Sequence, residues 1–173
     1  MKIPYKKIVL TLVLGIASVV LYFGMTLDFD TTRTIPQQTS KIEEIILSSD
    51  DSIESISFKE IIMSKEKNWI LFFSPNCSYC TDQIKLISGL QDRLIKSNIS
   101  LILVSTLDQK TTGAYLDEYD IRKSSDLYYT SEAILNENIQ DFSYPYTVIL
   151  DKDHNLIINH KGVFGFNEVK KLL

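Results

Sequence analysis

The sequence predicts an α/β domain, a mixed sheet flanked by helices, preceded by one N-terminal transmembrane helix. An uncharged apolar stretch near the start of the 173-residue chain predicts the membrane helix. After it, short apolar runs alternate with segments whose apolar residues recur at helical spacing, which is the pattern of helices layered on a sheet. The turn between the last two runs is too short for a crossover, so these strands are antiparallel and the sheet is mixed.

The predicted transmembrane helix covers residues 8–27, which are 20 residues without a charge. At about 1.5 Å per residue this helix spans roughly 30 Å, the thickness of the hydrocarbon core. Residues 1–7 carry three lysines, and basic flanks stay cytoplasmic, so the rest of the chain is expected outside the cytoplasm. A cleaved signal peptide is the alternative, but its apolar core is shorter, about 7–15 residues, and ends at small residues. Residues 21–25, LYFGM, fit such an ending poorly, so we favour an uncleaved anchor in the cell (inner) membrane with a periplasmic domain.

The net negative charge of the chain limits the classes of molecule that it is expected to bind. The chain has a net charge of −4, and residues 28–173 hold 15 Lys+Arg against 22 Asp+Glu, a net −7, because three lysines are the only charges before them. This acidity argues against nucleic acid and against a domain lying flat on anionic lipid. Residues 28–52 are polar, broken by Pro36 and closed by a turn, so they are interpreted as a tether and pre-domain segment ahead of the domain at 53–173.

The elements of the domain follow from periodicity and turn residues. Ser57 is placed to cap a short helix, with Glu60 at the reciprocal capping-box position. Residues 69–73, WILFF, are apolar throughout, as in a strand buried on both faces. The segment 42–47, IEEIIL, fits a helix or a strand. The expected strands are 53–57, 69–73, 98–105, 125–129, 146–150 and 156–160, and the expected helices are 58–62, 77–96, 108–121, 131–138 and 166–173.

The chemistry lies in Cys77 and Cys80, the only two cysteines, which form a C-x-x-C where a buried strand gives way to a helix. The spacing lets both sulfurs meet across one helical turn. The unpaired N–H groups and positive dipole end of a helix favour a thiolate at Cys77, the predicted nucleophile, while Cys80 resolves the mixed disulfide. The alternatives are two ordinary buried cysteines or half a zinc site. A zinc site needs two more ligands, and only His154 and His160 remain, both expected at the surface. We therefore predict a redox-active disulfide and neither a metal nor a cofactor.

At these residues the sequence resembles the thioredoxin superfamily, and more closely the membrane-anchored thiol–disulfide oxidoreductases of the TlpA/ResA type. The resemblance covers residues 53–173 and the anchor. WILFFSPNCSYC is similar to the family's strand and C-x-x-C, and YPYTVILD to its cis-proline loop and following hairpin. The spacing between these motifs implies the extra helix and strand of this type, here residues 108–129.

The resemblance implies further substrate-binding residues. Pro145 would follow a cis peptide bond and lie against the sulfurs, leaving the Tyr144 backbone free to pair with a substrate strand. A trans proline in a turn is the alternative. Gly162 would lie beside the site, where a side chain would block an approaching polypeptide. Tyr79 is expected at the helix tip, exposed to a partner. Five aromatic residues form either a groove near the sulfurs or, as we favour, core or edge packing: Tyr128, Tyr129, Phe142, Tyr144 and Tyr146.

The sequence also departs from the family. Asn76 replaces a common tryptophan, Leu71 stands where thioredoxins bury a carboxylate, and Gln83 stands where some relatives have a glutamate. Asp82 is expected to point into solvent. Without the two acids, the proton of Cys80 must leave through water, the backbone or a neighbour.

The predicted function is reduction or isomerisation of disulfides in exported proteins, with an external donor such as a membrane thiol transporter restoring the dithiol. A peroxidase is disfavoured because the P-x-x-x-T-x-x-C pattern is absent. The alternative function is a redox-inactive thioredoxin-fold module that binds a partner protein through the same groove.

Overall fold

The computed structural model describes residues 42, 44–49, 55–62 and 65–173. The described residues all belong to one compact unit within residues 35–173. The predicted anchor at 8–27 and most of the tether lie outside them. No helix in the described part of the chain is long and apolar enough to cross a membrane.

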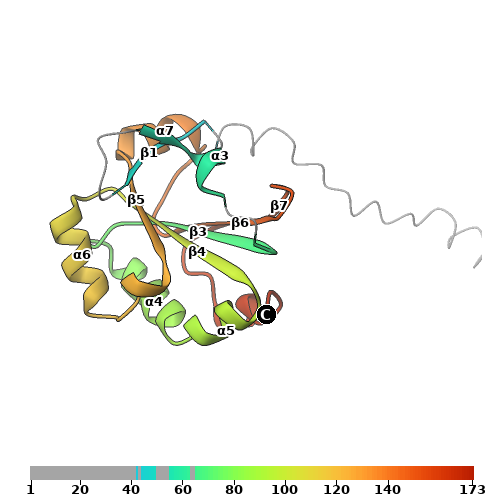
Figure 1. Ribbon diagram of the computed structural model, residues 1–173. Helices are drawn as coiled ribbons and strands as arrows, with labels where there is room; N and C mark the ends of the chain where they lie inside the picture. The colour runs from blue at the N-terminus through green and yellow to red at the C-terminus, as the bar shows by residue number, and fades with distance from the viewer. Residues whose placement is uncertain (1–41, 43, 50–54, 63–64) are drawn as a thin grey trace, which may run out of the picture. The chain divides into compact units, whose positions relative to one another are not determined.

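The described strands form one seven-stranded sheet in the order β2-β1-β5-β4-β3-β6-β7 (Figure 1). β4 pairs in parallel with both β3 and β5, and all other pairs are antiparallel, so the prediction of a mixed sheet is confirmed. The strands are β1 Ile46–Ser49, β2 Ser55–Ser57, β3 Lys67–Phe73, β4 Ile99–Ser105, β5 Asp126–Tyr129, β6 Tyr146–Asp151 and β7 Leu156–Lys161.

Helices cover both faces of this sheet. Side chains of α4, α5, α6 and α8 share one core cluster with one face, and those of α3 and α7 share a second cluster with the other. The helices are α3 Phe58–Ile61, α4 Ser78–Ser88, α5 Gln91–Lys96, α6 Gln109–Asp117, α7 Glu132–Asn138 and α8 Phe166–Val169, with a 3₁₀ turn η1 at Arg122–Ser124.

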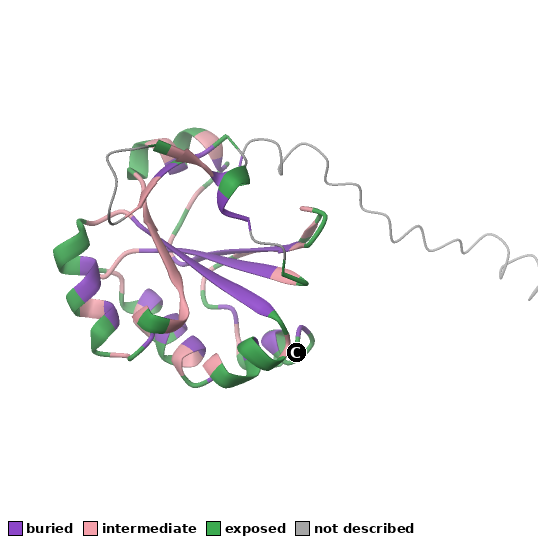
Figure 2. Ribbon diagram, in the orientation of Figure 1, coloured by how far each residue is buried: buried purple, intermediate pink, exposed green. Residues whose placement is uncertain are grey.

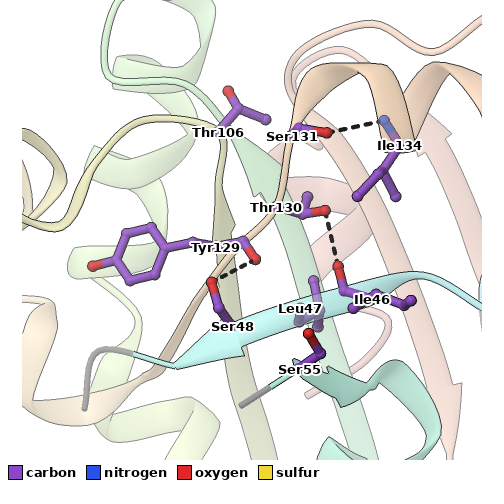
Figure 3. Close-up of a pocket in the computed structure, with 9 residues that line it drawn as sticks. All are labelled: Ile46, Leu47, Ser48, Ser55, Thr106, Tyr129, Thr130, Ser131 and Ile134. Carbon is purple, nitrogen blue, oxygen red and sulfur yellow. Dashed lines mark hydrogen bonds between the residues drawn. The ribbon is translucent and has the colours of Figure 1, made fainter. Parts of the chain in front are cut away.

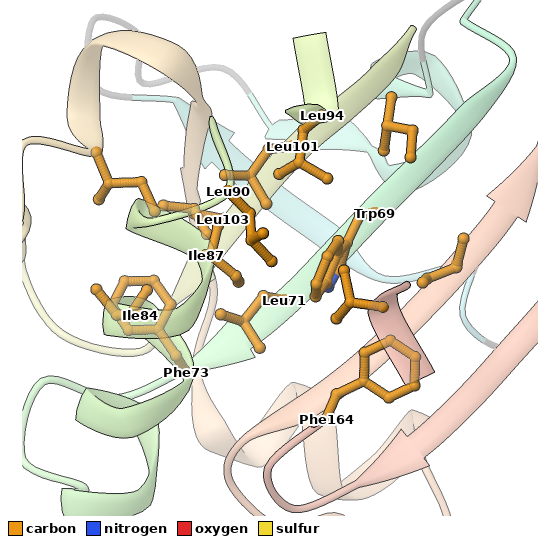
Figure 4. Packing of buried hydrophobic residues seen from close by; sticks show 14 of the residues in the cluster. Trp69, Leu71, Phe73, Ile84, Ile87, Leu90, Leu94, Leu101, Leu103 and Phe164 are labelled. Atoms are coloured by element: carbon orange, nitrogen blue, oxygen red, sulfur yellow. The ribbon is translucent and has the colours of Figure 1, made fainter. Parts of the chain in front are cut away.

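The central strands β3 and β4 are buried along nearly their whole length (Figure 2). Successive side chains of a strand point to opposite faces. Trp69, Leu71 and Phe73 therefore enter the α4 cluster, where Trp69 meets the Phe164 ring edge-on at 5.7 Å (Figure 4). Ile70 and Phe72 enter the other cluster. This double burial explains why the WILFF run has no polar alternation.

Local signals placed several boundaries correctly. The Ser57 N–H donates to the Glu60 carboxylate at 2.8 Å. This is the reciprocal hydrogen bond that the predicted capping box at the start of α3 requires. Asp108 and Ser131 cap α6 and α7 by accepting from backbone N–H groups. The insertion predicted at 108–129 is present as α6, η1 and β5, and β5 lies between β1 and β4.

Three elements differ from the prediction. The single helix expected at 77–96 is two helices, α4 and α5, because the chain turns at Gly89 and Leu90 and buries the Leu90 side chain. The sheet starts before residue 53, since β1 pairs with β5 and buries Leu47. The last helix is one turn, α8, rather than the full stretch 166–173.

Candidate functional site

The two cysteines lie at the carboxyl end of β3, at the start of α4. Cys77 is the N-cap residue of α4, and its N–H donates to the Ser74 carbonyl at 3.0 Å, which closes the turn after the strand. The Cys80 N–H donates to the Cys77 carbonyl, also at 3.0 Å. Both are free thiols on the first turn of the helix. The strand–turn–helix arrangement expected from the C-x-x-C is therefore present.

The two thiols differ in their access to solvent. Cys77 is half-buried, whereas Cys80 is 0% exposed. The pKa of Cys80 is raised to about 12, mainly because the thiol is buried; a hydrogen bond with the Ser74 backbone lowers this pKa, and the neighbouring Cys77 raises it. Cys80 is therefore a thiol at neutral pH, and Cys77 is the sulfur that an incoming molecule reaches.

The loop before β6 lies against Cys77. The Tyr144–Pro145 peptide bond is cis, as the resemblance implies. The Cys77 Sγ lies 4.0 Å from the Tyr144 carbonyl oxygen, within the range of a weak S–H donor. The Gly162 N–H donates to the Pro145 carbonyl at 2.8 Å. Residues far apart in sequence thus meet around the half-buried Cys77.

Gly162 has a backbone requirement as well as a place in the site. Its φ of +85° lies in the region that L side chains rarely adopt. A Cβ placed there would meet no atom of the described chain within 4 Å. The glycine therefore provides the turn after β7, and the space beside it is open to an approaching molecule.

Tyr144 is fixed by its side chain. Its hydroxyl donates to the Thr106 Oγ1 at 2.8 Å, and its ring meets Phe142 edge-on at 4.8 Å. Burial raises the pKa of Tyr144 to about 12, so the phenol stays protonated and keeps donating. Thr106 was not singled out from the sequence. Its position could have indicated a place in the site, because Thr106 directly follows β4. The carboxyl ends of the parallel strands β3, β4 and β5 meet at this edge of the sheet.

Thr106 also lines a pocket of about 410 Å³ at this edge of the sheet (Figure 3). The pocket combines hydroxyl side chains with apolar ones, and most hydroxyls bond within the chain, as Thr130 does to the Ile46 carbonyl at 3.0 Å. Its lining residues are Ile46, Leu47, Ser48, Ser55, Thr106, Tyr129, Thr130, Ser131 and Ile134.

Three apolar side chains, one on the first turn of α4 and two after β7, are exposed. Tyr79 is 65% exposed, as expected for a side chain at the helix tip. Val163 and Phe166, from the segment after Gly162, are 37% and 45% exposed. Asp82 is exposed as well, which agrees with the expectation that it is solvated.

The positions that lack the family's acids have structural roles. Leu71 is fully buried in the α4 cluster, together with Cys80 and Ile84. Gln83 is also fully buried, and its amide pairs with the backbone of Phe164 in both directions. Burial, the Ser74 backbone and Cys77 account for the shift of the Cys80 pKa, and neither Leu71 nor Gln83 supplies a carboxylate.

Two tyrosines that the sequence singled out have packing roles in the structure. Tyr115 on α6, which the sequence indicated only as a helix-face residue, donates to the Thr81 Oγ1 at 3.2 Å and stacks on Phe73 at 6.1 Å. Burial raises the pKa of Tyr115 to about 12. Tyr146, a candidate for an aromatic groove, is instead 0% exposed and packs in the core, as favoured from the sequence.

The two histidines lie on the β6–β7 hairpin. His154 lies in the β6–β7 turn with a φ of +65°, and the His160 Nε2 lies 3.2 Å from the Val163 carbonyl. Among the residues with described positions, no group of three or more His, Cys, Asp or Glu side chains is arranged to hold a metal ion.

Comparison with solved structures shows a shared fold. A thioredoxin-like protein from Porphyromonas gingivalis is 18% identical, with a TM-score of 0.60 over 76% of this chain and 89% of that one. A secreted Mycobacterium tuberculosis disulfide oxidoreductase homologous to E. coli DsbE is 10% identical, with a TM-score of 0.59 over 77% and 96%. StoA from Bacillus subtilis is 14% identical, with a TM-score of 0.55 over 73% and 95%. The thioredoxin-like fold is thereby confirmed.

Sequence comparison gives the family. No curated protein sequence matches the chain. A sequence profile of the AhpC/TSA family matches residues 34–164, which include both cysteines, the Pro145 loop and Gly162. The match spans most of the chain and every element that surrounds Cys77. The chain belongs to the AhpC/TSA family and has its thioredoxin-like fold.

Proposed function

We propose that this protein is a membrane-anchored, extracytoplasmic thiol–disulfide oxidoreductase that reduces or isomerises disulfides of exported proteins. The observation that carries the proposal is the pairing of an accessible Cys77 with a buried Cys80 beneath the Pro145 loop. An accessible sulfur next to a shielded one is what a two-step exchange requires. The M. tuberculosis neighbour that is described as a disulfide oxidoreductase supports the same chemistry.

The reaction proceeds in two exchanges. The Cys77 thiolate attacks one sulfur of a substrate disulfide, so a Cys77–substrate disulfide forms and the other substrate sulfur leaves as a thiolate. Cys80 then loses its proton and attacks the Cys77 sulfur, which releases the second substrate thiol and leaves a Cys77–Cys80 disulfide. Two electrons have passed to the substrate. A second protein dithiol, such as that of a membrane thiol transporter, returns the two electrons by the reverse exchange.

The second exchange is the step that this site makes difficult. Cys80 is fully buried and its pKa is raised to about 12, so little thiolate exists at neutral pH. The residues at positions 71 and 83 supply no carboxylate to accept the proton. We therefore expect the Cys77–substrate disulfide to persist longer than in a relative with a buried acid beside the second cysteine.

The location of the protein rests on the N-terminal sequence. Residues 8–27 are uncharged and long enough to span the membrane, and the lysines precede them. A protease that cannot cross the membrane, added to cells without their outer layer, should digest the domain. Protection of the domain until the cells are lysed would contradict this placement.

The decisive experiment traps the first intermediate. In a Cys80→Ser variant the resolving thiol is absent, so mixed disulfides on Cys77 should accumulate and be identified after non-reducing electrophoresis. A Cys77→Ser variant is the matched control and should trap nothing. Equal trapping by both variants would refute the order of the two cysteines. Absence of mixed disulfides in both would favour the redox-inactive module instead.

A further inference from the structure

One side chain connects the helix that carries the dithiol to the segment between β7 and α8. Gln83 is on α4, one turn after Cys80, and is 0% exposed. Its Oε1 accepts from the Phe164 N–H at 2.5 Å, and its Nε2 donates to the Phe164 carbonyl at 3.4 Å. Both halves of the amide are therefore used on one residue of the chain, 81 positions away.

Phe164 lies in the segment that joins Gln83 to the Pro145 loop beside Cys77. Its own ring is 2% exposed and packs edge-on against Trp69 at 5.7 Å and against His160 at 5.4 Å. Two residues earlier, the Gly162 N–H donates to the Pro145 carbonyl at 2.8 Å. The path from α4 through Gln83, Phe164 and Gly162 thus ends at the loop whose Tyr144 carbonyl lies 4.0 Å from the Cys77 sulfur.

The segment in this path has little stiffness of its own. It lies between β7 and α8 and has a glycine at each end, Gly162 and Gly165. Glycine gives the backbone more freedom than any other residue, so such a segment keeps one position only when contacts hold it. The two Gln83 hydrogen bonds are buried contacts of this kind, and losing a buried partner is costly.

The chemistry at Phe164 requires an amide. The backbone there presents one donor and one acceptor, and only a side chain that both accepts and donates satisfies them. An ionised glutamate at position 83 accepts from the N–H but turns its second oxygen toward the Phe164 carbonyl. This explains why glutamine suits a position where some relatives have a glutamate.

We infer that Gln83 is a positioning residue, whose amide fixes the Gly162–Phe164 segment and through it the Pro145 loop, so that a polypeptide substrate can dock beside Cys77. This inference rests on the proposed function, because it concerns docking for disulfide exchange. Small disulfides, which need no docking edge, do not depend on it.

The test compares two glutamines that hold distant segments. Gln91 on α5 also uses its whole amide, since its Nε2 donates to the Asp120 carbonyl at 3.0 Å and its Oε1 accepts from Ser124 at 2.5 Å. That segment does not lead to Pro145. Gln83→Glu and Gln83→Met are therefore compared with Gln91→Glu and Gln91→Met in the full-length chain in detergent.

Three readouts separate positioning from stability. For both Gln83 variants we expect kcat/KM for insulin reduction to fall about tenfold or more, mainly through KM. The reaction of the reduced protein with dithiobis(nitrobenzoate) should change by less than about twofold, because the Cys77 sulfur itself is untouched. Amide exchange at Gly162, followed by NMR, should accelerate about tenfold. The Gln91 variants should leave all three unchanged.

Several results would overturn the inference. Unchanged insulin kinetics in Gln83→Met, or an equal loss in Gln91→Met, would reduce Gln83 to a structural role. If Gln83→Glu does not fold, Gln83→Met decides, since it keeps the length and apolar stem of the side chain. If the unaltered protein reduces no insulin, the proposed function fails. The rate of amide hydrogen exchange at Gly162 then decides by itself whether Gln83 holds the loop.

Discussion

The two faces of β3 support different parts of the site: one face packs around Cys80, and the other packs near the Pro145 loop. Leu71 points into the cluster beneath α4, where Cys80 is also buried. Phe72, the next residue, points to the opposite face and meets the rings of Phe58 and Tyr146, each at 6.1 Å. The first face surrounds a thiol with uncharged side chains. The second packs aromatic rings under the segment that leads into the Pro145 loop.

This difference shows how one strand serves two halves of a site. The α4 face controls the protonation of Cys80, because desolvation is the largest cause of its raised pKa. The opposite face controls loop position, because Phe142 packs on Phe72 at 6.3 Å and on Tyr144 at 4.8 Å. Substitutions on the two faces should therefore have separable effects.

Phe72→Ala should give the largest loss of stability. Truncating a fully buried phenylalanine costs about 3–5 kcal/mol, and here the change removes three ring contacts at once. The free energy of unfolding is measured by denaturant titration, and the pKa of Cys80 by thiol titration. We expect the pKa to stay near its value in the unaltered protein. A fall in that pKa would contradict the separation of the two faces.

Leu71→Ala should lower both stability and the pKa of Cys80. The cavity costs about 2–5 kcal/mol, and the lost apolar cover reduces the desolvation that raises this pKa. Ile70→Ala is the matched control, because it removes an aliphatic side chain of the same strand from the other cluster. Its loss of stability should be similar and its Cys80 pKa unchanged. Identical pKa values in the two variants would disprove the role of Leu71.

Stability should fall at alkaline pH through Cys80. Its pKa is raised from an ordinary value near 9 to about 12 in the folded protein. Between these values the unfolded chain releases the proton and the folded protein keeps it, so unfolding becomes easier by up to about 1.4 kcal/mol per pH unit. The contribution is fully present below pH 9 and is lost as the pH rises toward 12.

Cys80→Ala is the control for this pH dependence. Tyr115 and Tyr144 also have raised pKa values of about 12, so a slope from the phenols persists above pH 10 in every variant. The difference between the unaltered protein and Cys80→Ala isolates the thiol. Parallel stability curves from pH 9 to 11 would show that the pKa of Cys80 is not raised on folding.

Tyr144→Phe should give the smallest effect. The change removes the hydrogen bond to Thr106 and keeps the ring against Phe142, so the expected loss is about 0.5–1.5 kcal/mol. Thr106→Val should cost a similar amount. The double variant should cost less than the sum, because both single changes break the same bond. Additive losses in the denaturant midpoints would mean that the bond contributes nothing.

The sequence alone predicted the elements whose signals are local. The WILFF run, the Ser57–Glu60 capping box and the short turn between β6 and β7 each depend on neighbouring residues, and the structure has each of them. The C-x-x-C at a strand–helix junction also needs only adjacent residues. The cis bond before Pro145 was implied by resemblance to a family rather than by any local rule.

Tertiary structure alone decided the contacts between distant residues. The helix expected at 77–96 breaks at Gly89 because burying Leu90 outweighs weak local propensity. Tyr144 bonds to Thr106, which is 38 positions away, and Gln83 bonds to Phe164, which is 81 positions away. No periodicity in the sequence indicates such long-range pairs. The sequence determined which groups carry the chemistry. The packing of the two faces decided which thiol is shielded and where the loop lies, because burial and long-range hydrogen bonds exist only once the sheet has formed.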